Sequence, residues 1–287
     1  MNSNIDLHMH SEASDGSDTV RELLRKIKTL GITTFALTDH DTVKGALEME
    51  KLVPPEIKYI RGIELSCKTE IAKCHILVYG YDPGNTAFQE LVAEAHRKRK
   101  NKNKKRFTYL EKTFGFEFTE EEKASFDEME SPGKPEFKEL IEKKLKQMDP
   151  EGEEVNIYET YLKGMPSDRM DAIRSVKTAI AAGGIAVWAH PLGGTGEKRL
   201  SKSDFDAQLA VLMQAGIKGL ECFYSEYTME EAEMLRRIAE QNGLLISGGS
   251  DYHGTRKPHL HLGMLNKEDE IVSEEKLTIF NIFYLNE

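Results

Sequence analysis

Histidines and carboxylates recur along this chain in short groups whose spacing would allow them to bind metal ions. His8 and His10 stand two residues apart in a stretch, residues 5–10, that alternates strictly between apolar and polar side chains. Because side chains two apart in a strand point to the same face, both imidazoles could bind one ion. The remaining groups along the chain are Asp15, Asp39-His40, Glu64, His75, His190, Glu221, and Asp251 with His253.

The types of these side chains indicate which metals and which chemistry to expect. Imidazoles mixed with carboxylates suit Mn²⁺, Zn²⁺ or Fe²⁺ better than Ca²⁺ or structural zinc. The three cysteines form no CxxC pair, so neither a thiolate site nor a disulfide framework is indicated. A lone histidine in a strand usually has a structural role, and the metal hypothesis therefore depends on the whole series. So many ligands predict two or three ions, which could polarise a phosphoryl group and activate water.

Each group lies near the end of a predicted strand, and helices separate most of the strands. The predicted strands are 5–10, 32–38, 58–66, 74–81, 185–191, 218–224 and 244–249. Predicted helices cover 19–30, 171–182, 203–215 and a segment that opens with the capping-box pattern Thr228-Met229-Glu230-Glu231. Ser17 or Asp18 is expected to cap the first helix, and Gly31 to end it. Alternating strands and helices predict a parallel sheet or barrel, and polar residues at strand ends favour a barrel.

The strand–helix rhythm is interrupted after residue 85 by roughly ninety charged, mostly helical residues. We therefore predict a barrel domain of residues 1–85 and 175–287 and an inserted helical subdomain of residues 86–174. Residues 97–106 (RKRKNKNKKR) carry eight basic side chains and no acidic one. Two interpretations of this run stay open: a solvated helix face, or a local attraction for phosphate-bearing substrates.

Composition narrows the class of protein. The 287 residues carry a formal net charge of −10, which argues against binding long nucleic acid on a broad basic surface. No apolar run approaches the roughly 20 residues that a membrane span requires. The first residues have neither the basic nor the apolar region of a signal peptide. These features, with so few cysteines, predict a cytoplasmic protein.

Taken together, the motifs resemble the PHP (polymerase and histidinol phosphatase) family, and especially its stand-alone bacterial phosphoesterases with a helical insertion. The resemblance rests on DLHMHSEASDG, ALTDHDT, GIELS, CHILVYG, AHP and SDYHG, and runs from residue 5 to about residue 263. It implies an α/β fold, a distorted (β/α)7 barrel of the PHP type with an inserted, mainly helical subdomain. It also implies three divalent metal ions, with Mn²⁺ expected and Zn²⁺ or Fe²⁺ as alternatives.

The same resemblance assigns the metal ligands in three sets. The sets are His8, His10, Glu64 and Asp251; Asp15, His40 and His253; and Glu64, His75 and His190. Glu64 would bridge two ions, and Asp15, His40, Glu64 and Asp251 are expected to carry catalysis. Glu221 falls outside these sets and is expected behind the ligands or near the substrate.

One motif departs from the family pattern. Insertion members usually read Gly-Arg-Pro-His at the start of an insertion helix, whereas this chain reads Gly133-Lys134-Pro135-Glu136. Lysine can contact phosphate as a point charge but lacks arginine's bidentate fork, and Glu136 would repel phosphate if it faced the site. The expected substrate contacts are Lys134, Arg199, Lys257 and His259.

The resemblance implies a metal-dependent phosphoesterase that hydrolyses phosphomonoesters by attack of metal-bound hydroxide. Its expected partner is a small phosphorylated substrate, either a nucleoside 3′,5′-bisphosphate or the end of a short oligonucleotide. No membrane and no stable protein partner are implied. Two alternatives stay open: a histidinol-phosphate phosphatase, and a non-catalytic nucleic-acid-binding module.

Overall fold

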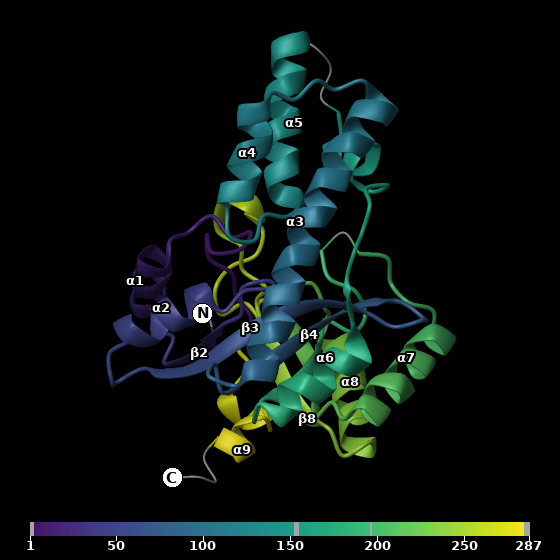
Figure 1. Ribbon diagram of the computed structural model, residues 1–287. Helices are drawn as coiled ribbons and strands as arrows, with labels where there is room; N and C mark the ends of the chain where they lie inside the picture. Colours follow the sequence, from purple (N-terminus) through teal and green to yellow (C-terminus); the bar gives the residue numbers. More distant parts are fainter. Residues whose placement is uncertain (1–2, 152–154, 196, 284–287) are drawn as a thin grey trace.

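The computed structural model describes residues 3–151, 155–195 and 197–283 (Figure 1). A few residues of the predicted domain ranges 1–85, 86–174 and 175–287 therefore lie outside the described ones. The strands are β1 (Ile5–Asp6), β2 (Thr34–Leu37), β3 (Lys58–Lys68), β4 (Lys73–Tyr79), β5 (Met170–Asp171), β6 (Ile185–Ala189), β7 (Gly219–Tyr224) and β8 (Leu245–Gly249). The helices are α1 (Val20–Leu30), α2 (Lys44–Leu52), α3 (Thr86–Phe114), α4 (Glu120–Glu128), α5 (Lys134–Met148), α6 (Ala172–Ala181), α7 (Lys202–Ala215), α8 (Met229–Gln241) and α9 (Phe280–Phe283). Short helical turns are η1 (Tyr158–Leu162), η2 (Gly254–Arg256) and η3 (Glu274–Lys276).

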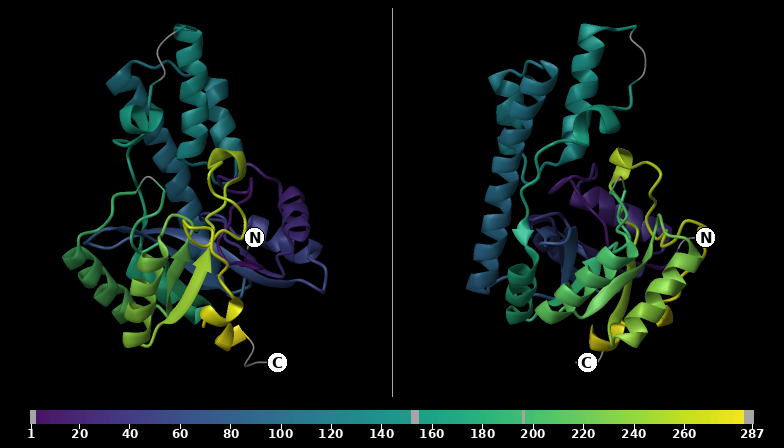
Figure 2. Two further views of the ribbon diagram at one scale, coloured as in Figure 1. Left: turned by 180° about the vertical axis from the view of Figure 1, so that it is seen from behind. Right: turned by 90° about the vertical axis from the view of Figure 1, so that its right-hand side faces the viewer.

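The strands form one sheet that nearly closes into a barrel. Their order is β1-β2-β3-β4-β6-β7-β8, and the short β5 pairs with the end of β3. Segments just beyond the first and last strands complete the ring. The backbone N–H of Leu7 donates to the carbonyl of Gly248 at 3.2 Å, and that of Asp251 donates to the carbonyl of His8 at 2.8 Å. This nearly closed, seven-stranded ring, with helices packed around it, confirms the predicted barrel class (Figures 1 and 2).

Strand β4 departs from the all-parallel arrangement that the alternating pattern suggested. It runs antiparallel to both of its neighbours, β3 and β6. The physical reason is the short connection of residues 69–72, closed by a hydrogen bond from Thr69 N–H to the Ala72 carbonyl at 2.9 Å. So short a loop can join only antiparallel strands. The reversal matters for the site, because it places the first residues of β4 beside the last residues of β3.

Local signals explain where several helices begin and end. Gly31 ends α1 in the left-handed conformation, and Thr228 caps α8 with a capping box, as predicted. The start of α1 differs from the prediction. Thr19, rather than Ser17 or Asp18, accepts the N–H of Glu22, since Glu22 reaches back to complete a capping box with it.

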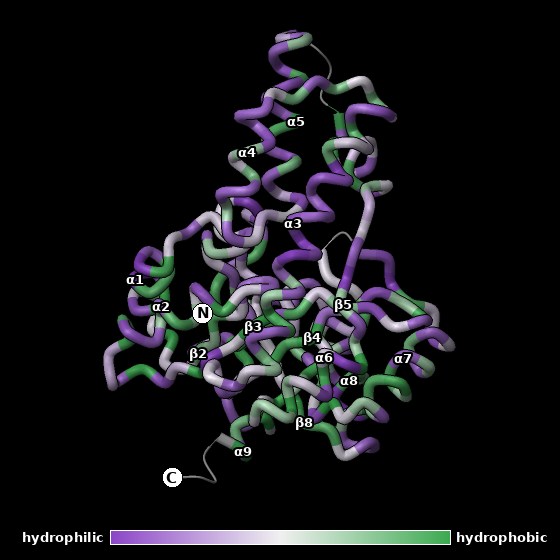
Figure 3. Tube along the Cα trace, viewed as in Figure 1, coloured by the Kyte–Doolittle hydropathy of each residue, from purple (hydrophilic) through white to green (hydrophobic). Residues whose placement is uncertain are grey.

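Apolar side chains concentrate along the strands and the inner helix faces, whereas the projecting helices are largely hydrophilic (Figure 3). The main core cluster includes Leu65, Leu77, Val187 and Phe223, all fully buried. No helix formed by the described residues has both the length and the apolar composition needed to span a bilayer.

Helices α3, α4 and α5 project from one end of the barrel (Figures 1 and 2). The first turns of α3 pack Phe88 and Leu91 into the barrel core, whereas its last turns contribute Phe107 and Leu110 to a separate apolar cluster with Phe137 of α5. Helix α3 therefore belongs to both parts and connects them. The boundaries 86 and 174 of the predicted subdomain stay a prediction.

Candidate metal centre

The nine predicted ligands converge at the end of the barrel from which the insertion projects. All of them are buried, although they come from positions as far apart in the sequence as His8 and His253. His8 and His10 lie just beyond β1, where Met9 still bridges to Tyr252, and both imidazoles reach the same cluster, as predicted. His75 lies near the start of β4 and pairs with Ser66, two residues after Glu64, so the antiparallel direction of β4 brings His75 beside Glu64. The fold thus brings the residues predicted from the sequence as metal ligands into one cluster.

Glu64 stands at the centre of the cluster. One carboxylate oxygen, Oε2, lies 3.1 Å from His8 Nε2, 3.2 Å from His10 Nε2 and 3.1 Å from His40 Nδ1. The other, Oε1, lies 3.2 Å from both His75 Nδ1 and His190 Nε2. Two sets of nitrogens thus face the two oxygens separately, as expected for a carboxylate that bridges two ions.

The ligand atoms group in space much as the three predicted sets require. His8, His10, Glu64 and Asp251 form one group, and Asp15, His40 and His253 fall in a second group that also includes His10. For the third set, the Glu64, His75 and His190 atoms named above are mutually 3.2 Å apart. A further group joins His75 and His190 to Glu197, a residue that the sequence prediction did not include.

The hydrogen bonding of these residues indicates that they could hold divalent ions. Among the described residues, His8 Nε2, His10 Nε2, His40 Nδ1, Asp15 Oδ1 and Glu64 Oε2 are buried and lack a hydrogen-bond partner. Buried polar atoms are normally satisfied, because leaving one unpaired costs roughly 1–3 kcal/mol. Nitrogen and oxygen donors that converge without partners are the arrangement that a cation satisfies.

Residues behind the ligands orient them. Glu221 Oε1 lies 2.9 Å from His8 Nδ1, and Glu221 Oε2 accepts the backbone N–H of His190 at 2.7 Å. The carbonyl of Asp251 lies 2.7 Å from Nδ1 of His253. Such acceptors fix the imidazole tautomer and leave Nε2 free for an ion. Glu221 thus lies behind the ligands rather than in the cavity, the first of the two positions expected for it.

The electrostatics of the site follow from burial and from the imidazoles. Burial by itself raises the pKa of Glu64, but the surrounding histidines, His40 first, hold that pKa well below its usual range. Burial also raises the pKa of Asp15, but His40 and His253 outweigh burial and hold that pKa well below its usual range. Both carboxylates are therefore ionised at neutral pH, as metal ligands must be.

Backbone strain is concentrated at the same place. His190, Asp251 and Asp41 have positive φ values of 27°, 55° and 56°, which non-glycine residues rarely adopt. Asp41 is held by Arg99, whose Nη1 donates to its carboxylate at 2.9 Å, while Arg99 Nη2 lies 3.5 Å from Asp15. Strain of this kind persists where surrounding contacts over-determine the conformation, and it clusters at functional sites.

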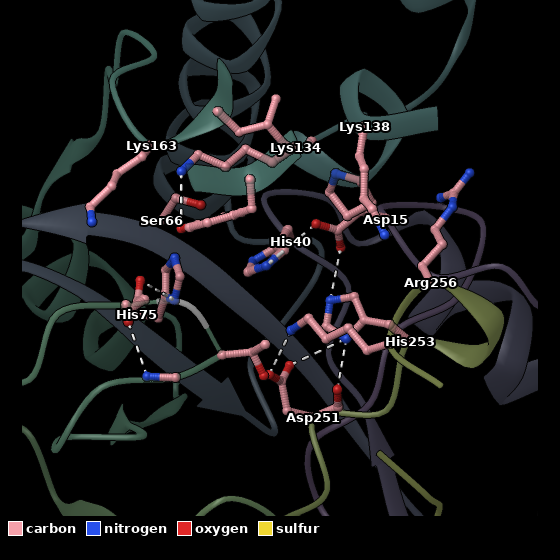
Figure 4. Close-up of a pocket in the computed structure, with 18 of the residues that line it drawn as sticks. Asp15, His40, Ser66, His75, Lys134, Lys138, Lys163, Asp251, His253 and Arg256 are labelled. Atoms are coloured by element: carbon pink, nitrogen blue, oxygen red, sulfur yellow. Dashed lines mark hydrogen bonds and ion pairs between the residues drawn. The ribbon is translucent and has the colours of Figure 1, made fainter. Parts of the chain in front are cut away.

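A cavity of about 1200 Å³ opens above the cluster, between the barrel and the base of the insertion. Figure 4 shows Lys134 and Lys138 on the side of the cavity opposite Asp251 and His253, with His40 and Asp15 between them. Five cationic side chains that line it are here called the cation cluster. They are Lys73, Lys102, Arg106, Lys134 and Arg169.

The basic run 97–106 contributes to this cavity. Arg99, Lys102 and Arg106 are buried and line it, whereas Arg97, Lys104 and Lys105 are exposed. Spacings of three and four residues place the first three on one helix face. The solvated-face interpretation therefore describes the outer residues of the run, whereas attraction for phosphate stays a prediction for the inner ones. These inward residues had not been singled out from the sequence. Their helical spacing was the signal that could have separated them from the rest.

The predicted substrate contacts divide into two groups. Lys134, Lys257 and His259 line the cavity. Arg199 does not: its guanidinium pairs with Glu231 at the start of α8 and lies over the Tyr227 ring. The expectation that Arg199 reaches the pocket is thus corrected, because α8 holds its side chain on the outside of the loop.

Glu136 is buried at the base of α5, and its position differs from that of a residue facing phosphate. Its carboxylate accepts the N–H of Gly133 at 2.6 Å and pairs with Arg256. Burial, and after it the nearby Asp15, raises the pKa of Glu136 to about 7. Its first role is therefore to cap α5 and to compensate Arg256.

Comparison with known proteins identifies the family to which the chain belongs. The family model described as the PHP domain matches residues 6–186. The chain belongs to the PHP family. A phosphoribosyl 1,2-cyclic phosphate 1,2-diphosphodiesterase of Eggerthella lenta is 28% identical, covering 89% of this chain and 97% of the relative. A 3′,5′-nucleoside bisphosphate phosphatase of Chromobacterium violaceum is 26% identical over 87% of each chain.

Two further similarities support this assignment. A 5′-3′ exoribonuclease of Haemophilus influenzae is 29% identical, covering 88% of this chain and 91% of the relative. A solved structure from Bifidobacterium adolescentis, described as a metal-dependent phosphoesterase, has a TM-score of 0.76 and 25% identity, covering 97% of this chain and 95% of that one. By their names, the three relatives from Eggerthella, Chromobacterium and Haemophilus act on phosphoric ester bonds, each on a different substrate.

Proposed function

We propose that this PHP protein is a metal-dependent hydrolase of phosphomonoesters that uses three divalent ions, with Mn²⁺ preferred over Zn²⁺ or Fe²⁺. The observation that carries the proposal is the convergence of nine buried imidazoles and carboxylates, several without hydrogen-bond partners, beside a cation-lined cavity. The three predicted ligand sets would hold the ions. When bound, such ions supply Lewis acidity and a water acidic enough to attack near neutral pH.

The chain's own residues would bind and orient the substrate. Lys257 Nζ donates to Asp251 Oδ2 at 2.8 Å, so it stands at the border between the ligand cluster and the cavity. Burial lowers the pKa of Lys257, but Asp251 outweighs it and raises that pKa, which keeps the ammonium charged. Lys257 is therefore placed to contact the phosphoryl group that is cleaved.

The cation cluster supports a substrate with more than one phosphoryl group. Lys102 is 6% exposed, and its ammonium has no hydrogen bond or ion pair with the described residues. Burial, and after it repulsion by Arg106, lowers the pKa of Lys134 to about 8. An anion bound between such cations would stabilise their charged forms. A second phosphate supplies one, and the cluster takes over the role that Arg199 was expected to fill.

The charge of the cavity discriminates among substrate classes. Nucleoside 3′,5′-bisphosphates and the ends of short oligonucleotides bring two phosphates, and relatives are named for both kinds of substrate. Histidinol phosphate brings one phosphate and a positive amine, which the cation cluster would repel. A non-catalytic nucleic-acid-binding module is disfavoured, because the buried cations of run 97–106 line a cavity beside the ligand cluster rather than a broad surface.

The test is a hydrolysis screen of Mn²⁺-loaded protein that follows both phosphate release and, by chromatography, the organic products. The panel should contain nucleoside 3′,5′-bisphosphates, nucleoside monophosphates, 5′-phosphorylated dinucleotides, a cyclic phosphodiester and histidinol phosphate. We expect release from the first and third classes to be fastest, and chelator to abolish it. Release from no substrate by protein that carries the ions would refute the proposal. Preference for the cyclic phosphodiester would keep the metal centre and refute the assigned substrate class.

A further inference from the structure

Glu197 stands beside the metal ligands although no family motif includes it. It lies in the loop between β6 and α7, where its N–H donates to the Gly194 carbonyl at 2.9 Å and its Oε2 accepts the Gly194 N–H at 3.2 Å. Its Oε2 is 3.5 Å from His190 Nδ1, and its Oε1 is 3.7 Å from Arg169 and 4.0 Å from His75 Nδ1. The side chain is about a third exposed, toward the cavity.

The orientation of His190 indicates what the contact between Glu197 and His190 does. Nε2 of His190 faces Glu64 and His75, so Nε2 is the nitrogen available to an ion. A neutral imidazole that binds through Nε2 carries its proton on Nδ1, and that proton needs an acceptor. Glu197 lies on the Nδ1 side of His190 at 3.5 Å, and Glu221 hydrogen-bonds to the corresponding Nδ1 of His8 at 2.9 Å.

The loop is built for a close approach at this edge of the ring. A Cβ on Gly194 would lie 3.0 Å from His190 Nδ1, closer than side chains normally pack, so glycine favours the close passage of the loop there. On the other side of Glu197, Arg169 is anchored by donating to the Cys74 carbonyl at 3.3 Å. The carboxylate thus lies between an imidazole of the metal centre and a member of the cation cluster.

We propose that Glu197 is a positioning residue that holds His190 in the tautomer that binds the third ion. The inference rests on the proposed metal centre. It places Glu197 beside Nδ1 of His190, on the side that faces the cavity. No supporting residue at this position had been predicted from the sequence. Loss of Glu197 should therefore weaken binding of that ion while leaving the fold unchanged.

The test compares Glu197→Ala, Glu197→Gln and the control Glu230→Gln, a carboxylate exposed at the start of α8. Chelator-treated proteins are titrated calorimetrically with Mn²⁺ and with Zn²⁺, without substrate. Removing such a supporting acceptor typically costs 10- to 100-fold in metal affinity, and we expect roughly that loss for one ion in Glu197→Ala. Glu197→Gln keeps an acceptor and should recover most of the affinity, while Glu230→Gln should match wild type.

A second readout separates positioning from a purely structural role. Metal-free Glu197→Ala should unfold within about 2 °C of wild type, since a partly exposed ion pair contributes little. In the Zn²⁺-loaded protein, imidazole ¹⁵N spectra should show His190 protonated on Nδ1 in wild type and changed in Glu197→Ala. A Glu197→Ala variant with wild-type metal affinity and a wild-type spectrum would refute the positioning role of Glu197 but not the proposed metal centre. A Glu197→Gln variant that binds the ion as weakly as Glu197→Ala would refute the positioning role and indicate that Glu197 is a direct metal ligand. Wild-type protein that binds no ions would refute the metal centre itself.

Discussion

Replacing Lys102 with methionine should make the protein more stable and a poorer enzyme on bisphosphorylated substrates. Lys102 is buried within α3, lines the cavity and has no partner among the described residues. Burial, followed by repulsion from Arg99 and Arg106, holds the pKa of Lys102 well below its usual range. The charged form of Lys102 is therefore unfavourable in the folded protein without substrate, and a bound anion would compensate it.

The two effects can be estimated separately. A buried polar group without a partner costs roughly 1–3 kcal/mol, and methionine of similar length keeps the aliphatic packing. At about 2 °C per kcal/mol, the Tm should rise by roughly 2–6 °C. A lost hydrogen bond to a charged phosphate costs roughly 1.5–3 kcal/mol, or about 10- to 150-fold in kcat/KM. That loss should apply to the bisphosphate and be much smaller for a monophosphate.

The assays are thermal unfolding of metal-free protein and steady-state kinetics of Mn²⁺-loaded protein on matched mono- and bisphosphates. Lys104→Met is the control, because Lys104 is exposed on the same helix and the change removes the same charge. A Lys102→Met protein with lower Tm and an unchanged ratio of kcat/KM values would show that Lys102 supports the fold. The second-phosphate role of the cation cluster would then be refuted.

Three further predictions concern other parts of the site. Glu64→Gln removes the charge that faces five imidazoles, so elemental analysis should find fewer ions and kcat should fall by roughly 100-fold or more. Lys134 has a pKa lowered to about 8, chiefly by burial; its ammonium is charged below that pH and neutral above it. The KM for a bisphosphate should therefore rise as pH rises through about 8, and Lys134→Met should remove this dependence. Arg99→Met leaves the buried Asp15 and Asp41 without their shared cation, so urea unfolding of metal-free protein should show a loss of roughly 3–5 kcal/mol. An Arg99→Met protein as stable as wild type would contradict this account of α3.

The barrel and its ligand cluster could be predicted because they depend on local patterns. Two-residue alternation placed His8 and His10 on one face, and the strand–helix rhythm predicted that distant strand ends would meet. The direction of β4 depended instead on a loop of four residues, a signal that was present in the sequence but outweighed by the rhythm. Its reversal explains how a histidine at the start of a strand reaches ligands at the ends of others.

The cavity was harder to predict because it depends on how side chains turn after the backbone is placed. Arg199 follows His190 closely in the chain, yet Glu231 from α8 attracts its guanidinium away from the pocket. Glu136 has the charge that phosphate should exclude, yet it caps α5 and pairs with Arg256. Both outcomes depend on contacts between distant elements, which spacing along the chain cannot reveal.

Helix α3 explains how an acidic protein presents a basic cavity beside its metal centre. Its first turns are fixed in the barrel core and its last turns in the insertion, so its rotation about its own axis is set at both ends. At about 1.5 Å per residue, Arg99 and Arg106 lie roughly 10 Å apart along that axis, with Lys102 between them. Arg99 pairs with carboxylates of the metal end, while Lys102 and Arg106 face the cavity farther out. The same helix face thus stabilises the ligand cluster and offers charge to a second phosphate, and a one-residue shift of register would turn all three cations away by about 100°.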